Sequence, residues 1–207
     1  MLTSKTVQQF LDETASHSPA PGGGSVSALA AALGAALTSM VCRLTTGKKK
    51  YTGVQREMEE VLKKSEDCRL RFSAMINEDT EAFNKVMAAF ALPKDSDDQK
   101  SKRDTAIQEA TKAATLVPLK LMELCEEALP LAKIVAERGN VNSISDAGVA
   151  ALILKAGCEG AYLNVRINLA SLTDKTFSTQ TLQRAGRISE HVISMGKEIM
   201  TIVGAKI

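Results

Sequence analysis

Apolar residues recur at intervals of three and four along almost the whole chain, and no segment alternates with the period of two that is typical of a strand. This pattern predicts an all-α protein, a single-domain helical bundle of about six or seven helices. The predicted helices cover approximately residues 7–15, 25–46, 54–90 with one break or kink, 97–138 with a break or kink at each of two prolines (118 and 130), 143–171 and 178–203.

Residues at the predicted helix ends support these boundaries. Ser25 can cap the second helix, and Gly47 can close it in a left-handed turn. Ser96–Gln99 and Ser143–Asp146 each have the spacing of a capping box, in which two side chains and two backbone N–H groups bond reciprocally. In the last helix, the predicted inward residues are Leu182, Ala185, Ser189, Val192, Met195, Ile199 and Ile202.

The second predicted helix is unusually rich in alanine and glycine, which makes it a thin cylinder. Neighbouring helices can approach such a cylinder closely, so we place it at the centre of the bundle. Its segment Val26–Cys42 holds 17 uncharged residues, a length at the edge of what crosses a bilayer. Small residues gain little from lipid, so a buried helix is the better interpretation, and we expect no membrane contact.

Composition narrows the class of protein further. The 207 residues suffice for one sizeable core, and without a linker or repeat we predict one domain over 1–207. A net charge of +2 and only five Phe, two Tyr and no Trp give no support for nucleic-acid binding. The four cysteines lie far apart without a C-x-x-C pair, so we predict no metal site. We expect the thiols to be free core residues, which fits a protein located in the reducing cytoplasm. The N-terminus does not resemble a secretory signal.

Three consecutive glycines, Gly22, Gly23 and Gly24, precede Ser25 at the start of the alanine-rich helix. Free N–H groups and the dipole at a helix start favour an anionic ligand group. The alternative is a tight turn that lets two helices cross closely, and spacing alone slightly favours the turn. The phosphate-binding patterns G-x-x-x-x-G-K-[ST] and G-x-G-x-x-G are absent, so nucleotide binding gains little support.

Asp79 interrupts the apolar stripe of the third helix, where it shares a face with Phe72, Ile76, Phe83 and Val86. A carboxylate on such a stripe is costly unless it is paired, hydrogen-bonded or protonated, and burial raises its pKa toward the range useful for proton transfer. Asp79 is therefore the candidate catalytic residue. The alternative is a structural ion pair with a neighbouring helix, or a helix turned so that Asp79 faces water.

Two amides form a second polar feature. Asn164 and Asn168 share one helix face with Gly157 and Ala161. Amides both donate and accept, which suits the edge of a heterocycle, but hydrogen bonds that fix helix packing are at least as good an explanation. Asp146 is explained equally by its capping box. His17 precedes the glycines and could touch a ligand, although a solvated loop residue is the simpler interpretation.

Six segments together resemble the cyclodeaminase/cyclohydrolase family of folate enzymes. This family includes the C-terminal domain of formimidoyltransferase-cyclodeaminase and stand-alone methenyltetrahydrofolate cyclohydrolases. The resemblance covers nearly the whole chain and rests on segments that occur in order: Pro21–Ser25, Asp79–Phe83, Leu92–Lys94, Val117–Lys120, Gly139–Asn140 with Ser145–Asp146, and Gly160–Asn168.

The resemblance implies a helical subunit that pairs into a homodimer and acts on a tetrahydrofolate derivative, with no permanently bound cofactor. It implies Asp79 as the catalytic acid and folate contacts from Gly22–Ser25, Asn164 and Asn168, with Asp146 as a further contact. Asn77 stands where relatives often carry an acid, which weakens mechanisms that need two carboxylates one helical turn apart. Lys48, in the run Lys48–Lys50, could attract the glutamate tail of folate.

Two reactions fit one tuned carboxyl group. We place formimidoyltetrahydrofolate cyclodeamination modestly ahead of methenyltetrahydrofolate hydrolysis. A third alternative, from a different class, is a helical folate-binding or assembly module without catalysis.

Overall fold

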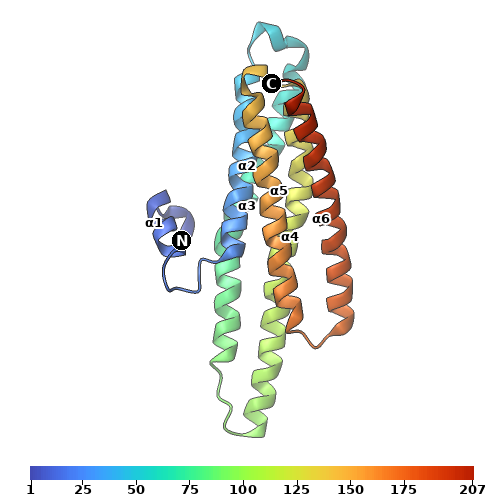
Figure 1. Ribbon diagram of the computed structural model, residues 1–207. Coiled ribbons are helices and arrows are strands. Elements are labelled where there is room, and N and C mark those ends of the chain that lie inside the picture. Colours follow the sequence, from blue (N-terminus) through green and yellow to red (C-terminus); the bar gives the residue numbers. More distant parts are fainter.

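The computed structural model describes all 207 residues and contains helices and turns but no strand. Five long helices lie roughly along one axis, and a short N-terminal helix stands beside them (Figure 1). The α-helices are α1 (Val7–Thr14), α2 (Gly23–Thr45), α3 (Gln55–Phe90), α4 (Asp97–Arg138), α5 (Ile144–Ala170) and α6 (Lys175–Gly204). Short 3-10 helices are η1 (Leu2–Ser4), η2 (Lys49–Val54) and η3 (Val141–Ser143). The predicted all-α class is confirmed, with six α-helices.

The start of α2 differs from the prediction that Ser25 caps it. Gly22 is the N-cap and makes no side-chain hydrogen bond, and Ser25 is the third residue of the helix, fully buried. The Ser25 hydroxyl donates to the Ile76 carbonyl oxygen of α3 and is therefore not used as a cap of its own helix. At the other end, Gly47 has a φ of +75°, which confirms the left-handed turn.

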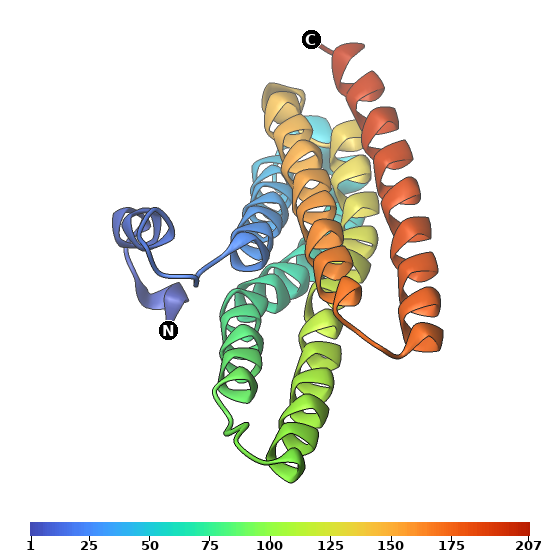
Figure 2. The same ribbon diagram turned by 60° about the horizontal axis from the view of Figure 1, so that its bottom comes forward.

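Helices α3 and α4 form a long hairpin whose tip extends beyond the rest of the bundle (Figures 1 and 2). The Ser96–Gln99 capping box is present at the start of α4, as predicted. Pro118 and Pro130 both lie inside α4 without ending it. Each proline removes one hydrogen bond from the helix. Packing of α4 against α2, α3, α5 and α6 holds it continuous across these gaps, which is why the chain has six helices and not seven.

The second predicted capping box does not form. Ser143 is the N-cap of α5, but its side chain makes no capping bond. Instead, the side chain of Asn140 accepts from the backbone N–H of Asn142 and donates to the carbonyl oxygen of Leu44 at the end of α2. These bonds fix the entry into α5, so the local box is not needed.

Helix α6 begins three residues earlier than predicted because Asp174 caps it by accepting from the N–H of Phe177. Of the predicted inward residues, Ala185, Ser189, Val192 and Ile199 are buried, and Met195 and Ile202 are half-buried. Leu182 is exposed, contrary to prediction; Thr181 occupies the buried position beside it.

The position of α2 at the centre is confirmed, because it packs against α3, α4 and α5. At Gly34 an added Cβ would lie 2.6 Å from Leu154 Cγ of α5, and at Gly157 it would lie 2.8 Å from the Ser27 carbonyl oxygen. Small residues therefore set the short α2–α5 distance. Helix α2 has the length and hydropathy of a membrane-spanning helix, but 61% of that window is buried inside the bundle.

Residues 1–18 form an N-terminal arm. Its helix α1 stands apart from the long helices in both views (Figures 1 and 2), whereas η1 contacts α3. The Thr6–Gln9 capping box starts α1, whose one buried residue is Phe10. Asn77 of α3 ties the arm down: its Oδ1 accepts from the N–H of Leu2 at 2.7 Å, and its Nδ2 donates to Thr3 Oγ1 at 3.3 Å. The residue that departs from the family pattern therefore has a structural contact of its own.

Candidate functional site

Asp79 lies in α3 directly against the first turn of α2. The hydroxyl of Ser25 is 3.0 Å from Asp79 Oδ2, 2.9 Å from the carbonyl oxygen of Ile76 and 3.1 Å from Thr80 Oγ1. A serine has one hydroxyl proton, so Ser25 donates to one of these acceptors at a time. The carboxylate is thus held by the start of a neighbouring helix and is half-buried.

Gly24 makes room for this carboxylate. A Cβ built on Gly24 would lie 2.0 Å from Asp79 Oδ1 and 2.4 Å from its Cγ, well inside any real contact. At Gly23 the same atom would be 3.5 Å from Asn164 Nδ2, and at Gly22 3.6 Å from the Pro19 carbonyl oxygen, which are ordinary contacts. Of the three glycines, Gly24 is the one that the position of Asp79 requires.

The pKa of Asp79 is set by opposing effects. Burial raises the pKa of its carboxyl group above the usual 3.8, while the hydroxyl and the backbone N–H of Ser25 act in the opposite direction. The free N–H groups at the N-terminus of α2 also favour a negative charge there. In the folded chain the Asp79 carboxyl group lies against this helix start. The anionic ligand group expected there stays a prediction.

The two amides of α5 are used differently. Asn164 faces Gly23 and donates through Nδ2 to the Gly160 carbonyl oxygen one turn earlier in its own helix, at 2.9 Å. Asn168 donates through Nδ2 to the Ala114 carbonyl oxygen of α4 at 3.2 Å. This second bond is the interhelical contact that the sequence left open. Asn164 therefore lies beside the glycine segment, while Asn168 also joins two helices.

Lys48 and Asp146 lie at the opposite end of α2 from Asp79 within one chain. Lys48 follows the C-terminus of α2, whose 23 residues span about 34 Å at 1.5 Å per residue. Asp146 lies in the first turn of α5, which enters the bundle beside Leu44 and Thr45. A single subunit thus brings Asp79, Gly22–Ser25 and Asn164 together, and separates them from Lys48 and Asp146. His17 is exposed on the loop before the glycines.

Thr80 is a site residue that sequence reasoning did not single out. Its hydroxyl lies within hydrogen-bond distance of the Ser25 hydroxyl, which also contacts Asp79. Ser25, Asp79 and Thr80 therefore form a three-residue cluster. The available signal was its position next to the misplaced acid, but spacing alone does not distinguish it from a solvated threonine.

Neither a reactive thiol nor a metal-binding cluster adds to this site. All four cysteines are buried, and burial raises the pKa of the Cys42 thiol to about 12 and that of Cys68 to about 11. Such thiols stay protonated at neutral pH and are poor nucleophiles. No group of three or more His, Cys, Asp and Glu side chains has an arrangement that could hold a metal ion.

Comparisons with known proteins agree with one another. The family model described as "Formiminotransferase-cyclodeaminase" matches residues 6–187. The "Methenyltetrahydrofolate cyclohydrolase" of Methylorubrum extorquens is 45% identical over the full length of both chains. The "Formimidoyltransferase-cyclodeaminase" of Rattus norvegicus is 37% identical over 88% of this chain, which spans only 34% of that larger protein. A crystal structure of formiminotetrahydrofolate cyclodeaminase from Thermotoga maritima superposes with a TM-score of 0.89 and 29% identity, and covers 99% of this chain and 98% of its own.

Proposed function

Because this chain belongs to the formiminotransferase-cyclodeaminase family, we propose that it is an enzyme of folate one-carbon metabolism with Asp79 as its acid/base. The substrate carries its one-carbon unit at or between N5 and N10 of tetrahydrofolate. The observation that carries the proposal is the half-buried Asp79 carboxyl group, held at 3.0 Å by Ser25 next to the glycine segment. The folate derivative supplies the reacting carbon, so the proposed chemistry requires no resident cofactor.

In the cyclohydrolase reaction, water attacks the methenyl carbon of 5,10-methenyltetrahydrofolate. Asp79 takes one proton from that water and its negative charge stabilises the cationic carbon. The N5–carbon bond then breaks as the carbonyl forms, N5 takes the proton from Asp79, and the remaining hydroxyl proton leaves to solvent. The product is 10-formyltetrahydrofolate. A positioned acid/base of this kind contributes roughly 10²–10⁴-fold to the rate.

In the cyclodeaminase reaction, N10 attacks the formimidoyl carbon and forms a tetrahedral centre that bears three nitrogens. The formimidoyl group enters protonated, as an amidinium, so its nitrogen is an amino group once N10 has added. Asp79 takes the N10 proton and delivers it to that amino group, which leaves as ammonia, and the 5,10-methenyltetrahydrofolate cation remains. Both nitrogens belong to one bound molecule, so proximity adds to the rate independently of Asp79. One carboxyl group therefore serves both reactions, because each passes through a tetrahedral carbon at the same place.

We favour the cyclohydrolase reaction on one observation. The stand-alone relative of that name is 45% identical from end to end, whereas the animal proteins match at 36–38% over about a third of their length. The cyclodeaminase reaction is the second candidate, supported by the Thermotoga maritima structure, which this chain also matches nearly end to end.

The deciding experiment follows the absorbance of methenyltetrahydrofolate with each substrate in turn. Decay of added methenyltetrahydrofolate identifies the cyclohydrolase, and its formation from formimidoyltetrahydrofolate identifies the cyclodeaminase. In whichever reaction proceeds, Asp79→Asn is expected to lower kcat roughly 10²–10⁴-fold. Glu78→Gln and Glu81→Gln are the matched controls, because both carboxylates are exposed on the same helix.

Full turnover by folded Asp79→Asn would remove Asp79 from the mechanism. Tight folate binding with neither reaction above background would instead favour the non-catalytic binding module.

Three further properties belong to the same proposal. We propose that the enzyme acts as a homodimer, and that Asn164 contacts the folate from the side opposite Asp79. Lys48 and Asp146 lie at the far end of α2 from Asp79, so we leave both out of the proposed folate contacts. Four buried thiols suit a reducing compartment, so we place the enzyme in the cytoplasm.

A further inference from the structure

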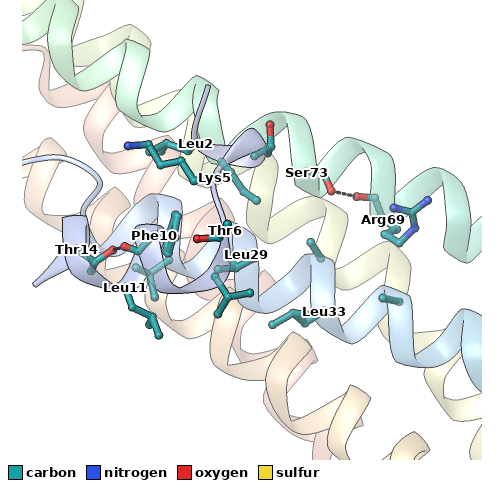
Figure 3. A pocket seen from close by; sticks show the side chains of 16 residues that line it. Leu2, Lys5, Thr6, Phe10, Leu11, Thr14, Leu29, Leu33, Arg69 and Ser73 are labelled. Atoms are coloured by element: carbon teal, nitrogen blue, oxygen red, sulfur yellow. Dashed lines mark hydrogen bonds between the residues drawn. The ribbon is translucent and has the colours of Figure 1, made fainter.

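A groove of about 460 Å³ separates the N-terminal arm from the bundle. We call this space the arm groove. Figure 3 shows Phe10 and Leu11 of α1 on one side and Leu29 and Leu33 of α2 on the other. Ten of its sixteen lining residues are hydrophobic. The arm groove is thus a space between two apolar surfaces that do not fully touch each other.

The arm leaves large apolar side chains exposed to solvent in the isolated chain. Val7 is 79% exposed and Leu11 is 55% exposed, although both belong to the apolar stripe of α1 that includes buried Phe10. The arm nevertheless has a fixed position, since Asn77 holds Leu2 and Thr3 by two hydrogen bonds. The arm is anchored and packs on the bundle through Phe10, but it leaves Val7 and Leu11 as apolar surface that a further partner can cover.

The charges at the arm groove are already neutralised within the chain. Lys5 pairs with Glu13 at 2.5 Å, and Arg69 binds Glu66 through two hydrogen bonds. The arm groove therefore offers no free cation to orient an anionic ligand. Its chemistry suits an apolar occupant.

The chain itself carries a matching apolar ridge. Leu163 is 62% exposed and Ile167 is 69% exposed, one turn apart on α5. Helix α5 packs directly beside α2, and its Asn164 faces Gly23, so the ridge lies level with the start of α2. A chain that carries both a groove and a ridge can pair with itself across a two-fold axis.

The exposed area supports a second copy as the occupant. A monomeric protein of 22.1 kDa is expected to expose about 9,300 Å², and the isolated chain exposes 11129 Å². The excess of about 1,800 Å² is larger than the ~800 Å² that each partner buries in a standard interface.

We propose that the arm groove receives the Leu163–Ile167 ridge of a second copy, and that the arm of each subunit clasps α5 of its partner. This inference rests on the proposed homodimer and adds how the two copies meet. It assigns the N-terminal arm a function in assembly, since within one chain the arm covers little of the bundle.

Sedimentation of the full-length protein tests the interface. We expect a wild-type mass of about 44 kDa, twice 22.1 kDa. Leu11→Asp and Ile167→Asp should each weaken pairing at least ~100-fold, because each places a charge in an apolar contact twice per dimer. Leu70→Asp is the matched control: Leu70 is an exposed leucine of α3 outside the arm groove, and that variant should remain dimeric. Both test residues are exposed in the isolated chain, so the variants should fold.

A cysteine pair tests the register. In Leu11→Cys combined with Ile167→Cys, a mild oxidant should form a disulfide-linked dimer that neither single variant forms. A wild-type dimer that both aspartate variants leave intact would overturn the clasp while leaving pairing and turnover untouched. A monomeric wild type would overturn both the clasp and the homodimer, and would not affect the assignment of Asp79.

Discussion

Replacing Gly24 by alanine tests whether the position of Asp79, and not merely its presence, is what the site needs. The added Cβ would lie 2.0 Å from Asp79 Oδ1, and an ordinary contact begins near 3.4 Å. The carboxylate oxygen must therefore move by about 1.4 Å, the difference between those distances. A misplacement of about 1 Å costs on the order of 10²-fold in rate, and full loss of an acid/base costs up to ~10⁴-fold. We expect kcat of Gly24→Ala to fall within that range.

The same substitution should change stability only modestly. Overpacking costs about 1–3 kcal/mol, and alanine gains up to ~1 kcal/mol over glycine within a helix. At about 2–4 °C per kcal/mol for a protein of this size, Tm should fall by no more than ~12 °C.

Gly34→Ala is the matched control in the same helix, because its Cβ would clash with Leu154 of α5, away from Asp79. It should lower Tm while kcat stays near that of the wild type. The assay is the decay of methenyltetrahydrofolate absorbance beside a thermal melt. If folded Gly24→Ala retained the wild-type kcat, the requirement for this carboxylate position would be refuted.

Four further substitutions distinguish effects on catalysis from effects on stability. Asp79→Asn should unfold at a higher urea concentration than the wild type at pH 7, and the difference should narrow toward pH 4. Burial raises the pKa of Asp79 in the folded chain above the usual 3.8, so ionisation of this group destabilises the fold as pH rises. The asparagine cannot ionise and avoids that loss. Ser25→Ala should move the acidic limb of the kcat/KM pH profile to higher pH, because the hydroxyl that lowers the Asp79 pKa is gone. Glu66→Gln should show the opposite stability trend, since hydrogen bonds from Arg69 above all lower the Glu66 pKa to about 2; its destabilisation at pH 7 should fade as pH falls from 4.5 toward 2 in urea titrations. Asn168→Ala should lower stability by about 1 kcal/mol through the lost bond to Ala114, and a simultaneous rise in KM would show that Asn168 also binds substrate.

The period of the apolar pattern was sufficient to predict the helices, because five of them bury one face against the others. It was insufficient where tertiary contacts override local signals. From the sequence, Pro118 predicts a helix break, but packing against four helices keeps α4 continuous at this residue. Ser25 reads as a cap, yet a partner on α3 takes its hydroxyl. Ser143 has the spacing of a capping box, but the hydrogen bonds of Asn140 fix the start of α5 instead.

Asp79 could be found from the sequence because a charged residue on an apolar stripe is a local conflict. Its partners could not be found in that way. The contact between Ser25 and Asp79 joins residues 54 positions apart, and which of three glycines meets the carboxylate depends on the crossing of α2 and α3. Likewise, periodicity gives α1 an apolar stripe but does not say that the stripe faces an unfilled groove.

The surroundings of Asp79 also predict how substrate binding is coupled to protonation of its carboxyl group. In the free protein, burial raises the pKa of the Asp79 carboxyl group, while Ser25 and the start of α2 oppose that rise. Methenyltetrahydrofolate brings a cationic carbon, and an opposite charge within a few ångströms lowers the pKa of a carboxyl group. Binding should therefore favour the ionised form of Asp79, which is the form that acts as a base. By linkage, the cation should bind more tightly as pH rises through the pKa of the free site, and this dependence should vanish in Asp79→Asn. Equilibrium binding of a non-reactive cationic folate analogue at several pH values measures it, and a pH dependence that survives in Asp79→Asn would assign the coupling to another group.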